Sequence, residues 1–141
     1  MPELNIAIDA MGGDNGPSIV IEALEKAVHQ YPDVKFTVVG HQHELTPLLE
    51  KHHLNSHPAV KLIHAEQIIE MDDKPGQSLR SKPESSMRIA LNTLTEGDCQ
   101  AMVSGGNTGA LMTNAYFTLK TLPGVLRPAL MTALPNQTGG K

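Results

Sequence analysis

The sequence is poor in cysteine, in long apolar runs and in positive charge, and each shortage excludes a class of protein. Cys99 is the only cysteine among 141 residues, so no disulfide can form within the chain, which agrees with a reducing compartment. No apolar run approaches the ~20 residues of a membrane span, and the first residues lack the basic stretch of a secretory signal. A net charge of -4 argues against a nucleic-acid partner. We expect a globular, cytoplasmic protein in which Cys99 is a packed thiol.

Familiar motifs for nucleotides and metals are missing as well. No Gly-Lys-Ser/Thr follows a glycine loop at the P-loop spacing, and the dinucleotide pattern Gly-x-Gly-x-x-Gly does not occur. Histidines crowd residues 41–64, but Asn55 and Pro58 argue against a continuous helix that would bring His53 and His57 onto one face. We therefore expect no cofactor and no metal site, and interpret these histidines as surface residues.

Short apolar runs alternate with amphipathic stretches along the chain, which is the pattern of an α/β protein. The predicted helices begin at Pro17, near Leu45, at Met87 and after Gly109, and Gly97 suits the end of the third. Because parallel strands need crossover connections, we expect one domain over residues 1–141 with an open, mostly parallel sheet and helices on both faces. The predicted strands are residues 4–9, 34–39, 60–65, 101–103 and 129–134.

Three apolar segments also predict which elements are buried. The apolar run 101–103 indicates a strand covered on both faces, and the helix 110–119 is apolar on most sides, which indicates a buried central helix. The strand 129–134 is equally apolar, yet no helix follows to cover it. We therefore expect the domain to be truncated at its carboxyl end, as the amino-terminal part of a longer protein.

The strongest candidate for a functional site is the glycine turn Ser104-Gly105-Gly106-Asn107-Thr108-Gly109. It follows a strand and opens a helix, so the unpaired N–H groups and the positive dipole end of the helix suit an anion. We predict that phosphate binds there, held by the N–H groups of residues 106–109 and by the Thr108 hydroxyl, with Asn107 as a ligand contact or as the N-cap. The alternative is a tight turn whose glycines serve packing and whose Asn107 only caps the helix.

A second glycine-rich loop follows the first strand and holds two carboxylates, Asp9 and Asp14. Open parallel sheets bind ligands at the carboxyl ends of their strands, so one of the two is a candidate base or orienter of a substrate group. The alternative is that Asp9 holds loop N–H groups and Asp14 serves the turn. Together with Asn107, these two residues are the predicted catalytic groups.

The stretch 66–86 is polar, contains two prolines and a glycine, and is long for an internal loop. These properties predict a mobile functional segment. Arg80 and Arg88, with Lys74 and Lys82, form the densest basic group of an acidic chain. The two arginines are candidates for binding phosphate or an acidic partner, whereas both lysines are interpreted as solvated.

Four segments, taken in this order, closely resemble the bacterial phosphate acyltransferase (PlsX) family. They are Asp9-Ala10-Met11-Gly12-Gly13-Asp14, Ser85-Ser86-Met87-Arg88, the turn from Ser104 to Ala110, and Arg127-Pro128-Ala129. The resemblance covers all 141 residues but only the amino-terminal part of that family's longer members. It implies a Rossmann-like fold similar to those of isocitrate dehydrogenase and phosphate acetyltransferase. It also implies conversion of fatty acyl-[acyl carrier protein] and inorganic phosphate to acyl phosphate and free carrier, at the start of bacterial phospholipid synthesis.

The same resemblance implies a cellular setting. Members of this family work as homodimers in the cytoplasm or peripherally at the inner face of the membrane, and pass their product to a membrane glycerol-3-phosphate acyltransferase. On this interpretation Arg80 and Arg88 would steer the acidic carrier protein. Phosphate would attack the thioester directly, while N–H groups at the helix start orient the anion or stabilise the oxyanion.

Other functions stay open at this point. A phosphate- or nucleotide-binding module would use the same turn, Gly105 to Thr108, without acyl transfer. A non-catalytic, architectural fragment of the same fold would need no ligand there. A dehydrogenase-like enzyme would share the fold, but the dinucleotide fingerprint that it requires is missing.

Overall fold

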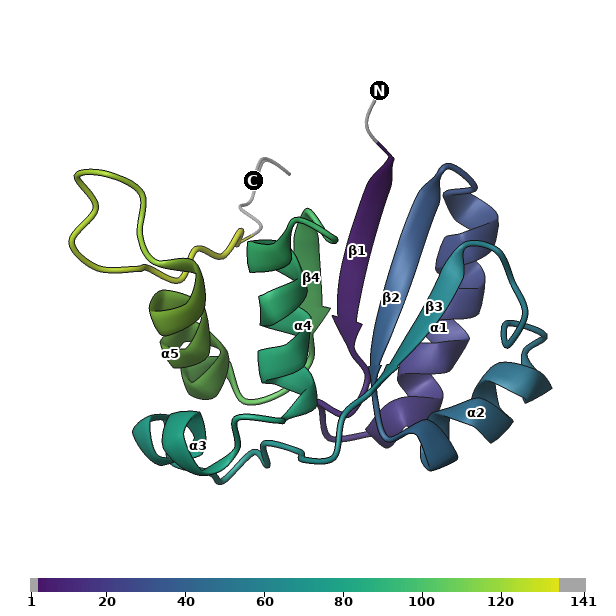
Figure 1. Cartoon of the computed structure of the whole chain (residues 1–141), viewed down its shortest axis with the longest axis horizontal. Helices are drawn as coiled ribbons and strands as arrows, with labels where there is room; N and C mark the ends of the chain where they lie inside the picture. The colour runs from purple at the N-terminus through teal and green to yellow at the C-terminus, as the bar shows by residue number, and fades with distance from the viewer. Residues whose placement is uncertain (1–2, 135–141) are drawn as a thin grey trace.

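Four parallel strands form one sheet in the computed structural model of the chain, which describes residues 3–134 (Figure 1). The strands stand side by side in the order β3-β2-β1-β4. Their bounds are β1 (Leu4–Asp9), β2 (Val34–Gly40), β3 (Val60–His64) and β4 (Ala101–Ser104). The helices are α1 (Gly16–Gln30), α2 (Gln42–Lys51), α3 (Pro75–Ser81), α4 (Ser86–Glu96) and α5 (Thr108–Leu119).

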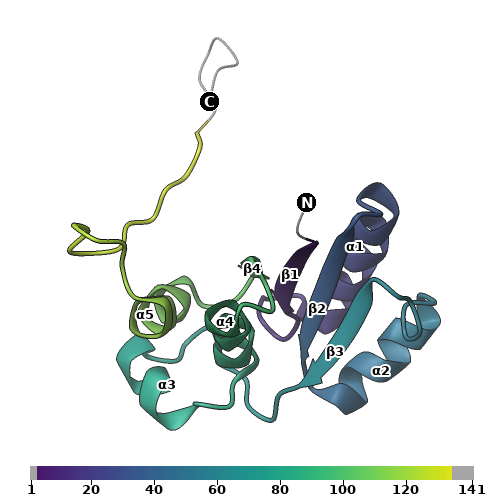
Figure 2. The ribbon, with the colours of Figure 1, turned by 45° about the horizontal axis from the view of Figure 1, so that its top comes forward.

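The chain reverses its direction across the sheet after β3. It first moves outward from β1 through β2 to β3, and then returns to add β4 on the other side of β1. Because crossovers between parallel strands are right-handed, opposite directions of travel put helices on opposite faces. Accordingly α1 and α2 cover one face and α4 covers the other (Figures 1 and 2). The expected parallel sheet with helices on both faces is confirmed.

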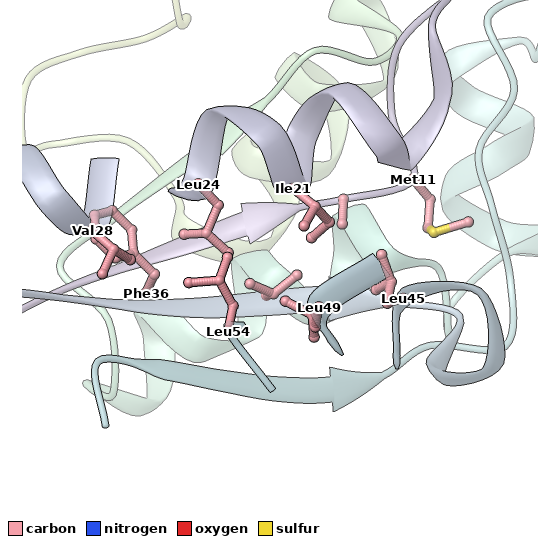
Figure 3. Close-up of a cluster of buried hydrophobic side chains, with 10 residues drawn as sticks. Met11, Ile21, Leu24, Val28, Phe36, Leu45, Leu49 and Leu54 are labelled. Carbon is pink, nitrogen blue, oxygen red and sulfur yellow. The ribbon is translucent and has the colours of Figure 1, made fainter. Parts of the chain in front are cut away.

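The main core lies between the sheet and the helices α1 and α2. Figure 3 shows the side chains of α1 pointing towards those of α2 above β2. The apolar residues of α1 recur every three or four positions, so they share one face of the helix. Each large aliphatic side chain buried there stabilises the fold by about 1.5–3 kcal/mol. The buried contributors from the three elements are Ile21, Leu24, Val28, Leu45, Leu49, Phe36 and Val38.

The opposite face is lined by small side chains, which let α4 lie close to the sheet. Ala7 and Val39 of the sheet meet Ala90 of α4, and Cys99 is buried in the same cluster. The predicted packed thiol at Cys99 is confirmed. The predicted end of this helix is also confirmed, since Gly97 is its C-cap with φ 84°, a left-handed conformation that favours glycine.

Two expectations about buried elements are wrong. β4 is an edge strand rather than a covered central one, and Val103 is 59% exposed. α5 is not a buried central helix, since Tyr116 and Phe117 are exposed while Ala110 and Asn114 are buried. Among residues 3–134 only β1 pairs with β4, which leaves β4 at the edge of the sheet. α5 packs along α3 and α4 at the flank of the molecule.

One predicted strand is wrong, and part of the predicted polar loop is helical, while the mobility of that loop stays a prediction. Residues 129–134, predicted as a strand, have no regular structure and are exposed, and Figure 2 shows this part of the chain leaving the layered body. No strand of the described part of the chain pairs with them, and apolar composition alone does not make a strand. The polar stretch 66–86 includes the helix α3, which begins at Pro75. Within residues 3–134, none of the helices has both the length and the apolar character needed to cross a membrane.

Candidate functional site

The carboxylate of Asp9 joins the segments that meet at the carboxyl ends of β1 and β4. It lies at the end of β1 and is only 2% exposed. Its Oδ1 accepts hydrogen bonds from the Ser86 hydroxyl (2.6 Å) and from the Met11 N–H (3.3 Å), and its Oδ2 accepts from the Ser104 hydroxyl (2.7 Å). This place is the switch point of the sheet, where the strand order reverses and open α/β sheets bind ligands.

The glycine loop after β1 lies directly against the turn after β4. A Cβ atom added at Gly12 would lie 2.8 Å from the Gly106 nitrogen and 2.9 Å from Asp9 Oδ2. Such distances are shorter than van der Waals contact, so only glycine fits without displacing the backbone. The predicted phosphate turn and the predicted carboxylate loop are therefore in contact, although about 90 residues separate them in the sequence.

The turn exposes fewer free N–H groups than its sequence suggests. The Gly106 N–H donates to Ser104 Oγ (3.1 Å), and the Ala110 N–H donates to Asn107 Oδ1 (3.0 Å). The first internal bond of α5 is made by Leu111, whose N–H donates to the Asn107 carbonyl (2.9 Å). The N–H groups of Thr108 and Gly109 precede that bond and have no partner inside the helix. Both residues are exposed, which makes these two N–H groups candidates for binding an anion.

Asn107 uses both ends of its side-chain amide to hold the structure together. Its Oδ1 caps α5, which confirms the predicted N-cap. Its Nδ2 donates to the backbone carbonyls of Glu70 (3.1 Å), Met71 (3.2 Å) and Asp73 (2.9 Å). These contacts tie the segment after β3 to the start of α5. They favour a positioning role for Asn107, and the catalytic role predicted for it stays a prediction.

The segment that Asn107 holds is also fixed by a carboxylate. Asp73 pairs with Lys82 and accepts the Glu70 N–H (2.8 Å). The hydrogen bond from Lys82, followed by that from the Glu70 N–H, lowers the pKa of Asp73. The prediction that Lys82 is solvated is therefore incomplete, because its side chain is only 27% exposed and its ammonium group is paired with Asp73.

The remaining predicted site residues lie at the same edge of the sheet but outside the Asp9 contacts. Asp14 is exposed in the loop between β1 and α1. Arg80 is exposed on α3, and Arg88 is half-buried in the first turn of α4. Ser86 was not predicted as a site residue. Its bond to Asp9 spans 77 residues of sequence, and no local pattern signals such a contact.

Comparison with known proteins gives a family. The family model described as "Fatty acid synthesis protein" matches residues 4–141. The chain belongs to this family. Among curated relatives, a phosphate acyltransferase of Idiomarina loihiensis is 87% identical over all 141 residues, and one of Legionella pneumophila (strain Corby) is 50% identical over the same length. A phosphate acyltransferase of Aeromonas salmonicida is 48% identical over 139 residues. The chain spans about 41% of the length of each of these relatives.

Two histidines of this family member are paired with glutamates near the ends of β2 and β3. His41 Nδ1 faces the Glu44 carboxylate (2.8 Å), and its Nε2 faces the Glu66 carbonyl (2.9 Å). Both partners only accept, so the protonated imidazolium satisfies both contacts. His64 Nε2 faces the Glu66 carboxylate (2.8 Å), and its Nδ1 accepts the Gln42 N–H (3.2 Å). Across residues 3–134 no three metal-ligating side chains converge.

We predict a pH-dependent contribution of His41 to stability. The Glu44 hydrogen bond, followed by the one to the Glu66 carbonyl, raises the pKa of His41 above 6.5. A raised pKa in the folded state stabilises the fold fully below the unfolded pKa, and this effect is lost as the pH rises through the folded pKa. His41→Gln should therefore lower the melting temperature by a few degrees at about pH 6 and by less at about pH 9. His29→Gln, at the exposed end of α1, is the matched control; equal losses at both pH values for His41→Gln would contradict the prediction.

Proposed function

We propose that this chain carries the phosphate-binding part of a phosphate acyltransferase that acts on fatty acyl-[acyl carrier protein]. The observation that carries the proposal is the exposed start of α5 at the switch point of the sheet, where the N–H groups of Thr108 and Gly109 have no partner inside the helix. Curated relatives named phosphate acyltransferase, matched over the whole chain, support the same reaction.

The proposed reaction needs an oriented anion more than a nucleophilic side chain. A phosphate oxygen attacks the thioester carbonyl, a C–O bond forms, the C–S bond breaks, and the proton of hydrogen phosphate ends on the carrier thiol. The N–H groups and the hydroxyl of Thr108 would hold the phosphate close to the carbonyl and lower the entropic part of the barrier. The same donors are suited to charge that develops on oxygen in the transition state.

The contacts of the three predicted catalytic residues suggest different tasks. Asp9 and Asn107 have their polar atoms engaged in bonds that hold the site, which favours positioning. Asp14 is exposed on the neighbouring glycine loop, and we propose it as the carboxylate that meets the substrate. No cofactor enters this scheme.

The proposed cellular setting follows the family resemblance. We propose a cytoplasmic homodimer, peripheral at the inner face of the membrane when it delivers its product to a membrane glycerol-3-phosphate acyltransferase. The acyl carrier protein is acidic, and the exposed Arg80 on α3 offers charge of the opposite sign. The half-buried Arg88 on the adjacent helix α4 would add to it.

A chimera tests the proposed function, because the chain matches only part of its relatives. In this chimera the 141 residues replace the matched segment of the Idiomarina loihiensis enzyme. With a long-chain acyl carrier protein as substrate, we expect release of free carrier thiol only when inorganic phosphate is present. Phosphate binding without thiol release would favour the alternative of a binding module, and neither binding nor release would leave an architectural fragment.

Thr108→Val should impair the use of phosphate. The variant removes one donor to a charged oxygen, a loss of about 1.5–3 kcal/mol, so kcat/KM for phosphate should fall by roughly one to two orders of magnitude. Thr113→Val, in the middle of the same helix, is the matched control and should keep the parent value. Parent-like phosphate kinetics in a folded Thr108→Val chimera would contradict the proposal that phosphate binds at the start of α5.

Arg80→Ala and Arg88→Ala should slow the reaction with the carrier-bound substrate. Electrostatic steering weakens with ionic strength, so each variant should also flatten the fall of kcat/KM with added salt. Lys51→Ala removes the same charge at the end of α2, a helix on the other side of the molecule from α3 (Figure 1), and should leave the salt slope unchanged. A salt slope equal to that of the parent in both arginine variants would rule out steering by these residues.

A further inference from the structure

We propose that Ser86 is a positioning residue for phosphate in this reaction. Its hydroxyl holds the Asp9 carboxylate in the one orientation that fixes the turn from Ser104 to Asn107. The inference rests on the proposed function and adds to it a buried residue on a different helix, α4.

The first step is the contact between Ser86 and Asp9. At 2.6 Å it is the shortest of the three hydrogen bonds to this carboxylate, and both residues are almost fully buried. The χ2 torsion of aspartate has broad preferences, so the donors on each oxygen set the plane of the carboxylate. Without Ser86, Oδ1 would retain the Met11 N–H at 3.3 Å, which is a long and weak contact.

The second step runs from Asp9 into the turn. The hydroxyl of Ser104 has one proton and gives it to Asp9 Oδ2 (2.7 Å), which leaves an oxygen lone pair for the Gly106 N–H (3.1 Å). This bond holds the Gly106 amide in the turn that leads to Thr108 and Gly109, the exposed residues at the start of α5. A rotated Asp9 carboxylate would withdraw the acceptor of Ser104 and release the turn.

The neighbouring residue Ser85 provides a natural comparison. Both serines are buried at the start of α4, at 0% and 1% exposure. The side chain of Ser85 accepts the Arg88 N–H (3.3 Å) and so caps its own helix. Only the hydroxyl of Ser86 reaches across to Asp9. Loss of a cap lowers stability by about 1 kcal/mol, whereas loss of the Ser86 contact should act on the turn.

The experiment compares these two serines in the chimera described above. Ser86→Ala should lower kcat/KM for phosphate by roughly tenfold to a hundredfold, the scale of small misplacements in catalytic sites, and leave KM for the acyl carrier substrate within about twofold. Ser85→Ala should lower the melting temperature without a selective loss for phosphate. Equal effects of the two variants on phosphate kinetics would overturn the proposal.

An isosteric pair separates the hydroxyl from the packing. Ser86→Thr keeps the donor, while Ser86→Val has the same shape without it, so Thr should retain phosphate kinetics close to the parent and Val should lose them. This pair decides the matter even if Ser86→Ala is insoluble. If the parent chimera releases thiol only with phosphate, and if Ser86→Thr and Ser86→Val have the same phosphate kinetics, then Ser86 has no positioning role and the proposed function stands. A folded parent chimera that shows no phosphate-dependent release of thiol would overturn both the proposed function and the role of Ser86.

Discussion

The buried carboxylate of Asp9 is the interaction on which the functional edge of this protein depends. Burying a charge is costly unless hydrogen bonds replace its water, and here two serine hydroxyls and one backbone N–H do so. The start of α4 adds the positive end of a helix dipole beside it. Because the donors come from the β1 loop, from α4 and from the end of β4, satisfying one carboxylate also fixes three chain segments relative to one another. A neutral apolar side chain at this position would leave both hydroxyls without their acceptor.

The side chain of Asn107 also holds two chain segments together by hydrogen bonds. Its amide is both the cap of α5 and the donor to three carbonyls between Glu70 and Asp73, so the helix start and the segment after β3 move together. The N–H groups of Thr108 and Gly109 therefore belong to an exposed helix start whose position these hydrogen bonds fix. Sites that bind and orient an anion need such preorganised support, since looseness of even 1 Å is costly.

The side of the molecule beyond β4 is apolar, unlike the polar site. Val103 of the edge strand, Phe117 of α5 and Met131 of the following segment all expose large apolar groups. An unpaired strand edge and exposed apolar groups favour association with another surface. The polar site and this apolar flank share α5, whose first turn faces the site and whose last turns carry the exposed aromatic pair Tyr116 and Phe117.

Local signals in the sequence by themselves determined four of the five helices that the structure describes, the four strands of the parallel sheet and several of their ends, but not α3. Gly97 stops α4 and Asn107 caps α5, because the bonds concerned join residues at most four apart. Only the tertiary structure decided that β4 lies at an edge, that residues 129–134 form no strand, and that Ser86 meets Asp9. An apolar run shows that a segment can be buried in a sheet, but it does not show how many strands pair with that segment. Strand pairing and the contacts of the site are bonds between distant segments, so they exist only once the whole chain has folded.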